Sequence, residues 1–195
     1  MSRLKIRIGT RKSKLALWQA KTVANKLKEI GYESSIITLK SDGDINLTQP
    51  LYSFGIQGVF TKTLDSALLE KKIDIAVHSL KDVPTSLPSE IVLGAVLKRG
   101  NPFDIIIHNK KEVFQKNGFI GTGSLRRKAQ WLNKYPADKI QPIRGNIQSR
   151  IKKLNTKKLK GIIISNAAIE RLSIKNIEFE KLDWMIPAPS QGTIG

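Results

Sequence analysis

Two groups of arginines lie where helices are expected to begin. Arg126 and Arg127 directly follow Ser124, the expected cap of one helix. Arg11 lies just before Ser13, the expected cap of another. A cation at the N-terminus of a helix opposes the helix dipole, so both placements are locally unfavourable. A bound anion would offset that cost, because a guanidinium group holds a carboxylate or phosphate through two parallel hydrogen bonds. These arginines therefore predict anion binding.

Further candidate residues follow a predicted buried strand at 73–77. Ser79, Lys81 and Asp82 come directly after this strand. Proteins of the α/β class bind ligands at the carboxyl ends of their parallel strands. For Lys81 and Asp82 taken alone, a plain surface ion pair is the simpler interpretation, but their position makes them candidates for a ligand site.

Three more arginines follow later strands. Arg144 and Gly145 come after a predicted strand and open a further helix, and Arg150 lies one turn into that helix. Arg171 is expected near the end of a short helix, where a cation suits the helix dipole. The structural interpretation of Arg171 is therefore strong.

The composition excludes several classes of protein. The 195 residues include no cysteine, which excludes disulfides, thiolate metal sites and a thiol nucleophile within the chain. No segment reaches the roughly 18 apolar residues of a membrane span, and residues 1–7 alternate charged and aliphatic side chains instead of forming an apolar signal core. His78 and His108 have no second ligand nearby, so we expect them to be structural and predict no metal site.

The charge balance is strongly basic. The chain has 34 Lys+Arg and 16 Asp+Glu, a formal net charge of +18. This excess suggests an anionic partner: nucleic acid, an acidic membrane surface or a polyanionic small molecule. However, only nine of the basic residues are arginines, and many of the lysines lie in solvated-looking pairs such as Lys152-Lys153. A Lys- and Ile-rich genome would produce the same excess, so the net charge alone leaves both interpretations open.

Strands alternate with helices along the chain. Period-two or continuously apolar segments predict strands at 3–9, 35–39, 73–77, 91–97, 104–107, 119–121, 140–143 and 161–165. Apolar residues at helical spacing predict helices at 16–30, 60–72, 124–132, 146–154 and 167–172. A long loop is expected over 41–58. This alternation favours an α/β architecture with mainly parallel sheets, divided into two similar lobes.

A short pattern occurs once in each predicted lobe. A strand leads into Gly9-Thr10 and the cap Ser13, and another leads into Gly121-Thr122 and the cap Ser124. Helix starts expose unpaired N–H groups that suit anions, but taken alone the pattern is a weak signal, and ordinary helix capping is its simpler interpretation.

Five segments together resemble the porphobilinogen deaminase (hydroxymethylbilane synthase) family. They are RIGTRKSKLALWQA, GIQGVFTKTLDSALLEKKIDIAVHSLKDVP, GTGSLRRKAQ, IRGNIQSRIKKL and PAPSQGTIG. The resemblance extends over nearly the whole chain, with the segments in the family's order, and IDIAVHSLKDVP and GTGSLRR are the most specific. Six of the nine arginines fall on the family's substrate- and cofactor-binding positions: Arg11, Arg126, Arg127, Arg144, Arg150 and Arg171.

The resemblance implies a fold and a domain plan. The fold would be α/β, with two lobes like those of type II periplasmic binding proteins, mainly parallel sheets and a cleft between the lobes. We assign residues 1–98 to the first lobe and 99–189 to the second. Residues 190–195 would begin a return to the first lobe, and the family's third domain would be missing. We therefore expect the chain to be a piece of a longer enzyme.

The resemblance also implies a reaction in tetrapyrrole (heme and porphyrin) biosynthesis. Four porphobilinogen molecules are joined head to tail on a dipyrromethane cofactor, each losing ammonia, and hydroxymethylbilane is released. In the family the dipyrromethane is attached through a thioether to a cysteine of the third domain. This chain has no cysteine, so we expect it to be inactive as a transferase by itself.

The resemblance assigns roles to particular residues. Asp82 would be the catalytic carboxylate, Lys81 would pair with a carboxylate of the substrate or cofactor, and Phe60 would pack against a pyrrole ring. The implied substrate- and cofactor-binding residues are Arg11, Ser13, Phe60, Ser79, Lys81, Thr122, Ser124, Arg126, Arg127, Arg144, Gly145, Arg150, Arg171 and Gln191. The sequence departs from the family at Asp65, where Glu is usual, and in the loop at 40–44. Neither departure removes a catalytic group.

The expected partners are porphobilinogen and linear oligopyrrole carboxylates, and we expect a cytoplasmic monomer that binds neither nucleic acid nor membranes. Two alternatives come from other functional classes. A non-catalytic, periplasmic-type anion-binding protein is disfavoured by the Lys81-Asp82 pair and by the lack of a signal core. A nucleic-acid-binding protein is suggested by the charge, but aromatic residues make up only 6% of the chain, and base-stacking surfaces need them.

Overall fold

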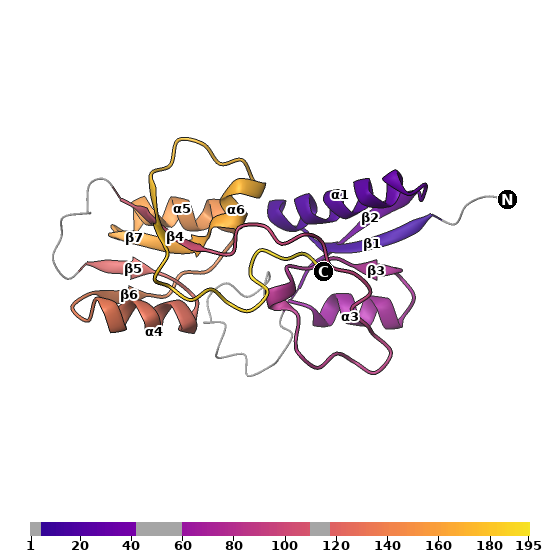
Figure 1. Cartoon of the computed structure of the whole chain (residues 1–195), viewed down its shortest axis with the longest axis horizontal. Coiled ribbons are helices and arrows are strands. Elements are labelled where there is room, and N and C mark those ends of the chain that lie inside the picture. The colour runs from indigo at the N-terminus through magenta and orange to yellow at the C-terminus, as the bar shows by residue number, and fades with distance from the viewer. Residues whose placement is uncertain (1–4, 42–59, 110–117) are drawn as a thin grey trace. The chain divides into compact units, whose positions relative to one another are not determined.

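The computed structural model describes residues 5–41, 60–109 and 118–195, and its backbone forms two compact units (Figure 1). Within the described residues, the first unit contains 5–41, 60–100 and Gly192–Gly195. The second unit contains the described part of Asn101–Gln191. The loop predicted at 41–58 lies outside the described residues except for Ser41.

The first unit is built on a three-stranded parallel sheet in the order β2-β1-β3. Its strands are β1 (Ile6–Arg11), β2 (Ser34–Leu39) and β3 (Ile75–Ala76). The helices α1 (Lys14–Glu29) and α3 (Lys62–Leu69) cover opposite faces of this sheet (Figure 1).

Alternation along the strands supplies both faces with apolar side chains, because successive side chains of a strand point to opposite sides. Ile8 and its neighbour Ile36 pack with Ala20 of α1. The next residue of β2, Ile37, packs with Leu64 of α3 on the other face. The sequence of each strand thus decides which helix each side chain meets.

The limits of α1 follow from local chemistry. Ser13 caps the helix, since its Oγ accepts a hydrogen bond from the backbone N of Ala16 at 3.2 Å. At the other end, Gly31 adopts a φ of 84°, which a residue with a side chain rarely takes. The predicted cap and stop are both confirmed.

The second unit is built on a five-stranded mixed sheet in the order β6-β5-β7-β4-β8. Its strands are β4 (Asp104–His108), β5 (Phe119–Gly121), β6 (Lys139–Gln141), β7 (Gly161–Ser165) and β8 (Phe179–Leu182). Strands β5, β6 and β7 are parallel, while β4 pairs antiparallel with both β7 and β8. The prediction of an α/β fold with mainly parallel sheets is confirmed.

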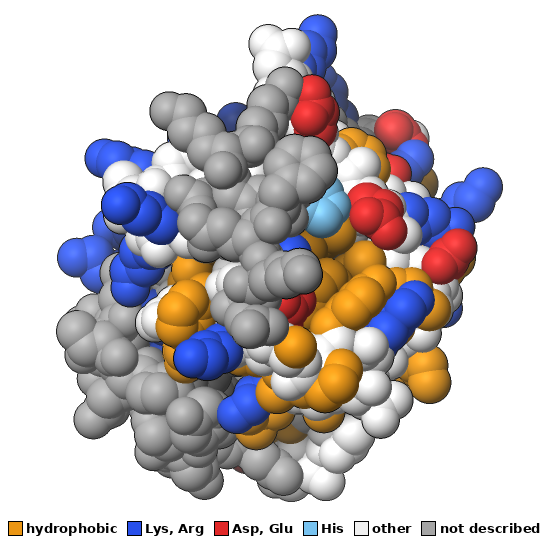
Figure 2. Space-filling model, turned by 90° about the vertical axis from the view of Figure 1, so that its left-hand side faces the viewer, with side chains coloured by type: hydrophobic (Ala, Val, Ile, Leu, Met, Phe, Trp, Pro, Cys, Tyr) orange, Lys and Arg blue, Asp and Glu red, His pale blue; other side chains and the backbone are white. Residues whose placement is uncertain are grey.

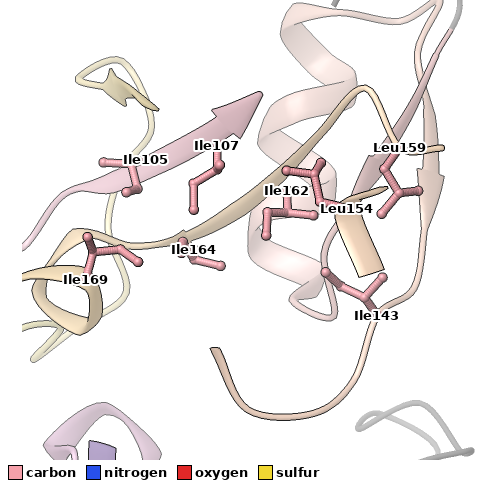
Figure 3. Packing of buried hydrophobic residues seen from close by; sticks show 8 residues of the cluster. All are labelled: Ile105, Ile107, Ile143, Leu154, Leu159, Ile162, Ile164 and Ile169. Atoms are coloured by element: carbon pink, nitrogen blue, oxygen red, sulfur yellow. The ribbon is translucent and has the colours of Figure 1, made fainter. Parts of the chain in front are cut away.

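Apolar layers cover both faces of this sheet. Its helices are α4 (Leu125–Lys134), α5 (Ile147–Thr156) and α6 (Asn166–Arg171). One layer, drawn in Figure 3, consists of Ile105, Ile107, Ile143, Leu154, Leu159, Ile162, Ile164 and Ile169. The other includes Ile106, Ile120, Ile163 and Trp131 of α4. The continuous isoleucine runs of β4 and β7 are explained by this two-sided burial.

One predicted strand is wrong, and one strand of the structure was not predicted. The segment 91–97 forms no strand, and its Val92 side chain is 81% exposed. An apolar run becomes a strand only where a neighbour pairs with it along its length, and here Leu97 N donates an isolated hydrogen bond to Ile194 O at 2.9 Å. The strand that was not predicted is β8. Only Leu182 of its four residues is buried, so the segment has no apolar pattern typical of a strand.

Two observations on the described residues concern membrane spans and the distribution of the positive charge. No helix in these ranges is both long and apolar enough to cross a membrane. On the face shown in Figure 2, Lys and Arg side chains lie at several separate places among hydrophobic and polar ones. The positive charge on this face is dispersed.

Gly9 of β1 gives a test of the first unit's packing. A Cβ at this position would lie 2.2 Å from Ile73 Cδ1 and 2.9 Å from Leu64 Cδ2, both in the core beneath α3. We expect Gly9→Ala to lower the free energy of unfolding by about 1–3 kcal/mol, because the core must shift to accept the methyl group. Urea unfolding followed by circular dichroism measures the loss.

The matched control is Gly94→Ala in the same unit. A Cβ at Gly94 would meet no atom within 4 Å, so its stability should change by less than about 0.5 kcal/mol. Equal unfolding midpoints for the two variants would contradict the packing described for Gly9.

Candidate functional site

In the second unit, three helices start at the carboxyl edge of the parallel strands. Strand β5 is followed by α4, β6 by α5 and β7 by α6. The first two helices have side-chain caps: Ser124 Oγ accepts from Arg127 N at 3.4 Å, and Asn146 Oδ1 accepts from Ser149 N at 2.9 Å. Parallel strands place these helix starts, with their unpaired N–H groups, at one edge of the sheet. This edge is the candidate anion site of the second unit.

The loop after β5 packs closely against the loop after β6. Thr122 is 2% exposed, and its Oγ1 accepts a hydrogen bond from Ser124 N at 3.2 Å. A Cβ on Gly123 would lie 2.8 Å from Ile143 O, a backbone atom of the neighbouring loop. The glycine therefore allows the two loops to approach each other.

Backbone oxygens of the loop after β6 accept hydrogen bonds from two cations of α5. Arg150 Nε donates to Gly145 O at 2.8 Å, and Lys153 Nζ donates to Arg144 O at 2.8 Å. Gly145 has a φ of 107°, which disfavours any residue with a side chain. Arg144 is itself 7% exposed. The structure thus brings Arg144, Gly145 and Arg150 together beside the start of α5.

A carboxylate that the sequence analysis missed lies beside the arginine pair of α4. Asp104, the first residue of β4, is fully buried. Its Oδ2 accepts from Arg126 Nη2 at 2.5 Å, and its Oδ1 accepts from Arg127 Nη2 at 2.7 Å. Gln191 Nε2 also donates to Asp104 Oδ1, at 2.9 Å. The anion expected near these arginines is therefore present within the protein itself.

The arginines determine the ionisation of Asp104. Burial alone would raise the pKa of its carboxyl, but the charges and hydrogen bonds of Arg127 and Arg126 outweigh burial and hold that pKa below its ordinary value. The carboxylate therefore stays ionised, and its contribution to stability is lost only as the pH falls below the ordinary range of an aspartate.

Arg171 lies apart from these helix starts. It is the last residue of α6, so the six-residue length of the helix separates it from the carboxyl edge of β7. Burial lowers the pKa of its guanidinium, and the charge of Glu170 opposes that shift. Its position at a helix C-terminus agrees with the structural interpretation made from the sequence.

In the first unit, the predicted residues gather around the ends of β1 and β3. The guanidinium carbon of Arg11 lies 4.2 Å from the centre of the Phe60 ring, a cation–π contact. Ser13 caps α1, and Ser79 Oγ accepts a hydrogen bond from Gln19 Nε2 at 2.7 Å. Phe60 therefore contacts a predicted binding arginine.

Asp82 and Lys81 lie on the short 3-10 helix Leu80–Asp82 that follows β3. The backbone N of Asp82 donates to Ser79 O at 2.9 Å, and the side chain is half-buried. This turn fixes the candidate catalytic carboxylate next to Ser79 at the end of a parallel strand.

His78 has charged neighbours on three elements. Burial lowers the pKa of its imidazole; the negative charges of Asp65 on α3 and of Asp82 oppose this shift, and Arg11 at the end of β1 reinforces it. From the sequence, His78 was expected to be structural, without a connection to Asp82. Their spacing of four residues after a buried strand was the available signal.

The structure thus forms two groups of predicted residues, one in each unit, and each stays a set of candidates for binding. Among the described residues, no group of His, Asp and Glu side chains is arranged to hold a metal ion. Gln19 and Asp104 are additions to the predicted set. Asp104 had one signal in the sequence, since it is an acidic residue at the head of the apolar run Asp104–His108 in a chain with few acids.

The fold is that of the type II periplasmic-binding-protein class. Solved structures with this fold include the periplasmic VFT2 domain of BvgS from Bordetella pertussis, with a TM-score of 0.51 at 10% identity, covering 97% of this chain and 78% of that one. Another is the probable amino-acid ABC transporter extracellular-binding protein YtmK from Bacillus subtilis, with a TM-score of 0.50 at 12% identity, covering 98% and 83%. At these identities the likeness concerns the fold alone.

Similarity in sequence gives a narrower assignment than similarity in fold. The family model described as "Porphobilinogen deaminase, dipyromethane cofactor binding domain" matches residues 6–195, so the chain belongs to the porphobilinogen deaminase family. It is 46% identical over 193 residues to a probable porphobilinogen deaminase of Methanocaldococcus jannaschii, covering 97% of this chain and 65% of the relative. It is 43% identical over 199 residues to the porphobilinogen deaminase of Desulforamulus reducens, covering 97% and 64%. The chain thus spans slightly less than two thirds of the length of these relatives.

The charged groups near His78 predict how the pKa of its imidazole responds to substitutions. We expect its pKa to lie below 6.5 and to fall further in Asp82→Asn, because that change removes a charge that raises the pKa. Arg11→Met should raise it instead. NMR of the imidazole signals gives the values directly, since the chain has only two histidines and a His108→Gln variant assigns them.

The exposed Asp74 provides a control, because it pairs with Arg7 and does not contribute to the pKa of His78. Asp74→Asn should leave the titration unchanged. A depressed pKa also means that the contribution of His78 to stability is complete above pH 6.5 and falls below it, because the unfolded chain binds the proton first. A pKa for His78 that rises in Asp82→Asn would refute the arrangement.

Proposed function

We propose that this chain contributes the substrate- and cofactor-binding part of a porphobilinogen deaminase, a transferase of tetrapyrrole biosynthesis. The enzyme would join four porphobilinogen molecules head to tail on a dipyrromethane, releasing ammonia and finally hydroxymethylbilane. Membership of the family supports this proposal. The cytoplasmic location, the monomeric state and the lobes at 1–98 and 99–189, with residues 190–195 returning to the first, stay predictions.

The observation that carries the proposal is the group of arginines in the loops and first helical turns at the carboxyl edge of β5 and β6. Each porphobilinogen brings an acetate and a propionate, so a growing chain of pyrroles is a polycarboxylate. Arg126, Arg144 and Arg150 lie beside helix starts at this edge. Each charged hydrogen bond from such a group contributes about 1.5–3 kcal/mol. The positively charged arginines therefore suit a ligand that carries several carboxylates.

Dipyrromethane, when bound, would supply the pyrrole carbon that receives the first substrate unit. The guanidinium groups fit its carboxylates, whereas no thiol of this chain can form the thioether, because the chain has no cysteine. In the first unit, the proposed binding residues are Arg11, Ser13, Phe60, Ser79 and Lys81. In the second unit, they are Thr122, Ser124, Arg126, Arg127, Arg144, Gly145, Arg150, Arg171 and Gln191. Of these, Gln191 is fully buried and donates to Asp104, so its role would be to support the site.

Asp82 would supply the catalytic charge. Loss of ammonia from porphobilinogen leaves a cationic, electrophilic pyrrole, and a nearby carboxylate stabilises that cation and accepts or returns protons. Asp82 suits this role because it lies on the short turn after β3, where its negative charge acts on His78. Lys81 would pair with a ligand carboxylate, and Phe60, held by Arg11, would pack against a pyrrole ring.

Asp82→Asn tests the catalytic assignment in the natural protein carrying its dipyrromethane. The change keeps the shape and removes the charge, so we expect turnover to fall at least about 100-fold with the thermal midpoint nearly unchanged. Hydroxymethylbilane release, followed by conversion to uroporphyrin, measures turnover. Asp74→Asn, in the same unit, should retain activity. Near-normal turnover by Asp82→Asn would mean that another group stabilises the cation.

The 195-residue chain by itself should bind dipyrromethane carboxylates without forming a covalent adduct. Mass spectrometry after incubation with porphobilinogen should show the unmodified chain and no product, because only a thiolate has the nucleophilicity to anchor the cofactor. Calorimetry should show binding of a free dipyrromethane tetracarboxylate, weakened about tenfold or more in Arg150→Gln. Arg99→Gln serves as the control for loss of a positive charge. Sustained turnover by the chain, or equal binding by both variants, would count against the proposal.

A further inference from the structure

The buried carboxylate of Asp104 lies against the same arginine pair that is expected to meet ligand anions. Its side chain is fully buried, that of Arg127 is 7% exposed and that of Arg126 is 24% exposed. The contacts to both arginines are at most 2.7 Å long. These are short, charge-assisted hydrogen bonds.

The hydrogen-bond donors of this pair are largely used within the protein. Arg127 directs Nη2 to Asp104 and Nη1 to Ile163 O at 3.1 Å. Arg126 directs Nη2 to Asp104 and Nη1 to the backbone oxygen of Ile186. Among the described residues, the buried Nε of Arg127 has no partner. The cluster thus has two positive charges, one negative charge and one unused buried donor.

We propose that Asp104 is the internal counter-ion of Arg126 and Arg127, and that it limits how tightly the start of α4 binds external oxyanions. Asp104 is a positioning residue in this role: it orients both guanidinium groups and neutralises one of their two charges. The identity of the natural oxyanion as a pyrrole carboxylate rests on the proposed function, whereas the competition between Asp104 and an external anion does not.

The physical reason is the cost of buried charge. Removing one partner of a buried ion pair leaves the other charge uncompensated. Without Asp104, the nearly buried Arg127 would be such a charge, at a helix start whose dipole already opposes cations. An external phosphate or carboxylate would then relieve both costs. In the wild-type protein Asp104 already compensates both costs, so an added anion binds less tightly.

Asp104→Asn tests this competition with inorganic phosphate as the probe. We expect a lower thermal midpoint without phosphate and about tenfold tighter phosphate binding than in the wild type, because one nearby negative charge is gone. Thermal midpoints measured against phosphate concentration at constant ionic strength give the affinities. Asp104→Glu, which keeps the charge, should restore the wild-type affinity.

Asp138→Asn is the matched control. Asp138 is also buried in the second unit, but it accepts from Trp131 Nε1 at 3.0 Å and Lys160 Nζ at 3.2 Å instead of from Arg126 or Arg127. Asp138 represents a carboxylate with a purely structural role. Asp138→Asn should therefore lower the thermal midpoint, while its phosphate affinity stays at the wild-type value. Phosphate affinity in Asp104→Asn that is equal to or below that of the wild type would overturn the proposal.

If Asp104→Asn does not fold in plain buffer, the same idea predicts that phosphate restores its far-ultraviolet circular dichroism, and failure of that rescue would overturn it. A parallel titration with dipyrromethane tetracarboxylate separates the two proposals. Phosphate competition without any dipyrromethane binding would reject the proposed function alone. Dipyrromethane binding to the wild type, with no change of phosphate affinity in Asp104→Asn, would reject the counter-ion alone.

Discussion

A buried charge must be neutralised where it lies, and the second unit is arranged around one such charge. Asp104 has no access to water, yet the arginines hold its pKa below the ordinary value. Its oxygens connect the head of β4 with the first turn of α4 and with Gln191 near the end of the chain. Breaking one partner of such a buried pair costs about 3–5 kcal/mol. Three segments distant in sequence are therefore fixed to one another by this carboxylate.

This constraint also explains why α4 tolerates two arginines in its first turn. The helix dipole and the cations repel each other there, but Asp104 supplies a compensating negative charge at contact distance. In the first unit, Arg11 precedes the start of α1 and contacts the ring of Phe60. An arginine near a helix start is thus held by a buried carboxylate in the second unit and contacts an aromatic face in the first.

The short pattern shared by the units serves different local purposes. Both serines cap helices, as the sequence predicted. The threonines differ: Thr10 Oγ1 donates to Ala16 O at 3.1 Å, whereas Thr122 Oγ1 accepts from Ser124 N at 3.2 Å. Gly9 lies within β1, but Gly121 ends β5. Similar residues therefore give similar helix starts, while the neighbouring packing decides the details.

The sequence by itself determined the α/β class, most strands and helices, the capping serines and the family, because periodicity, caps and specific motifs are local signals. It also identified the arginines, whose chemistry is intrinsic to the residue type. Only the tertiary structure showed that Asp104 meets Arg126 and Arg127, that His78 is surrounded by charges, and that 91–97 is not a strand while Phe179–Leu182 is. These outcomes depend on which distant segment lies opposite. Burial of a charge and pairing of a strand both require a partner that local spacing does not specify.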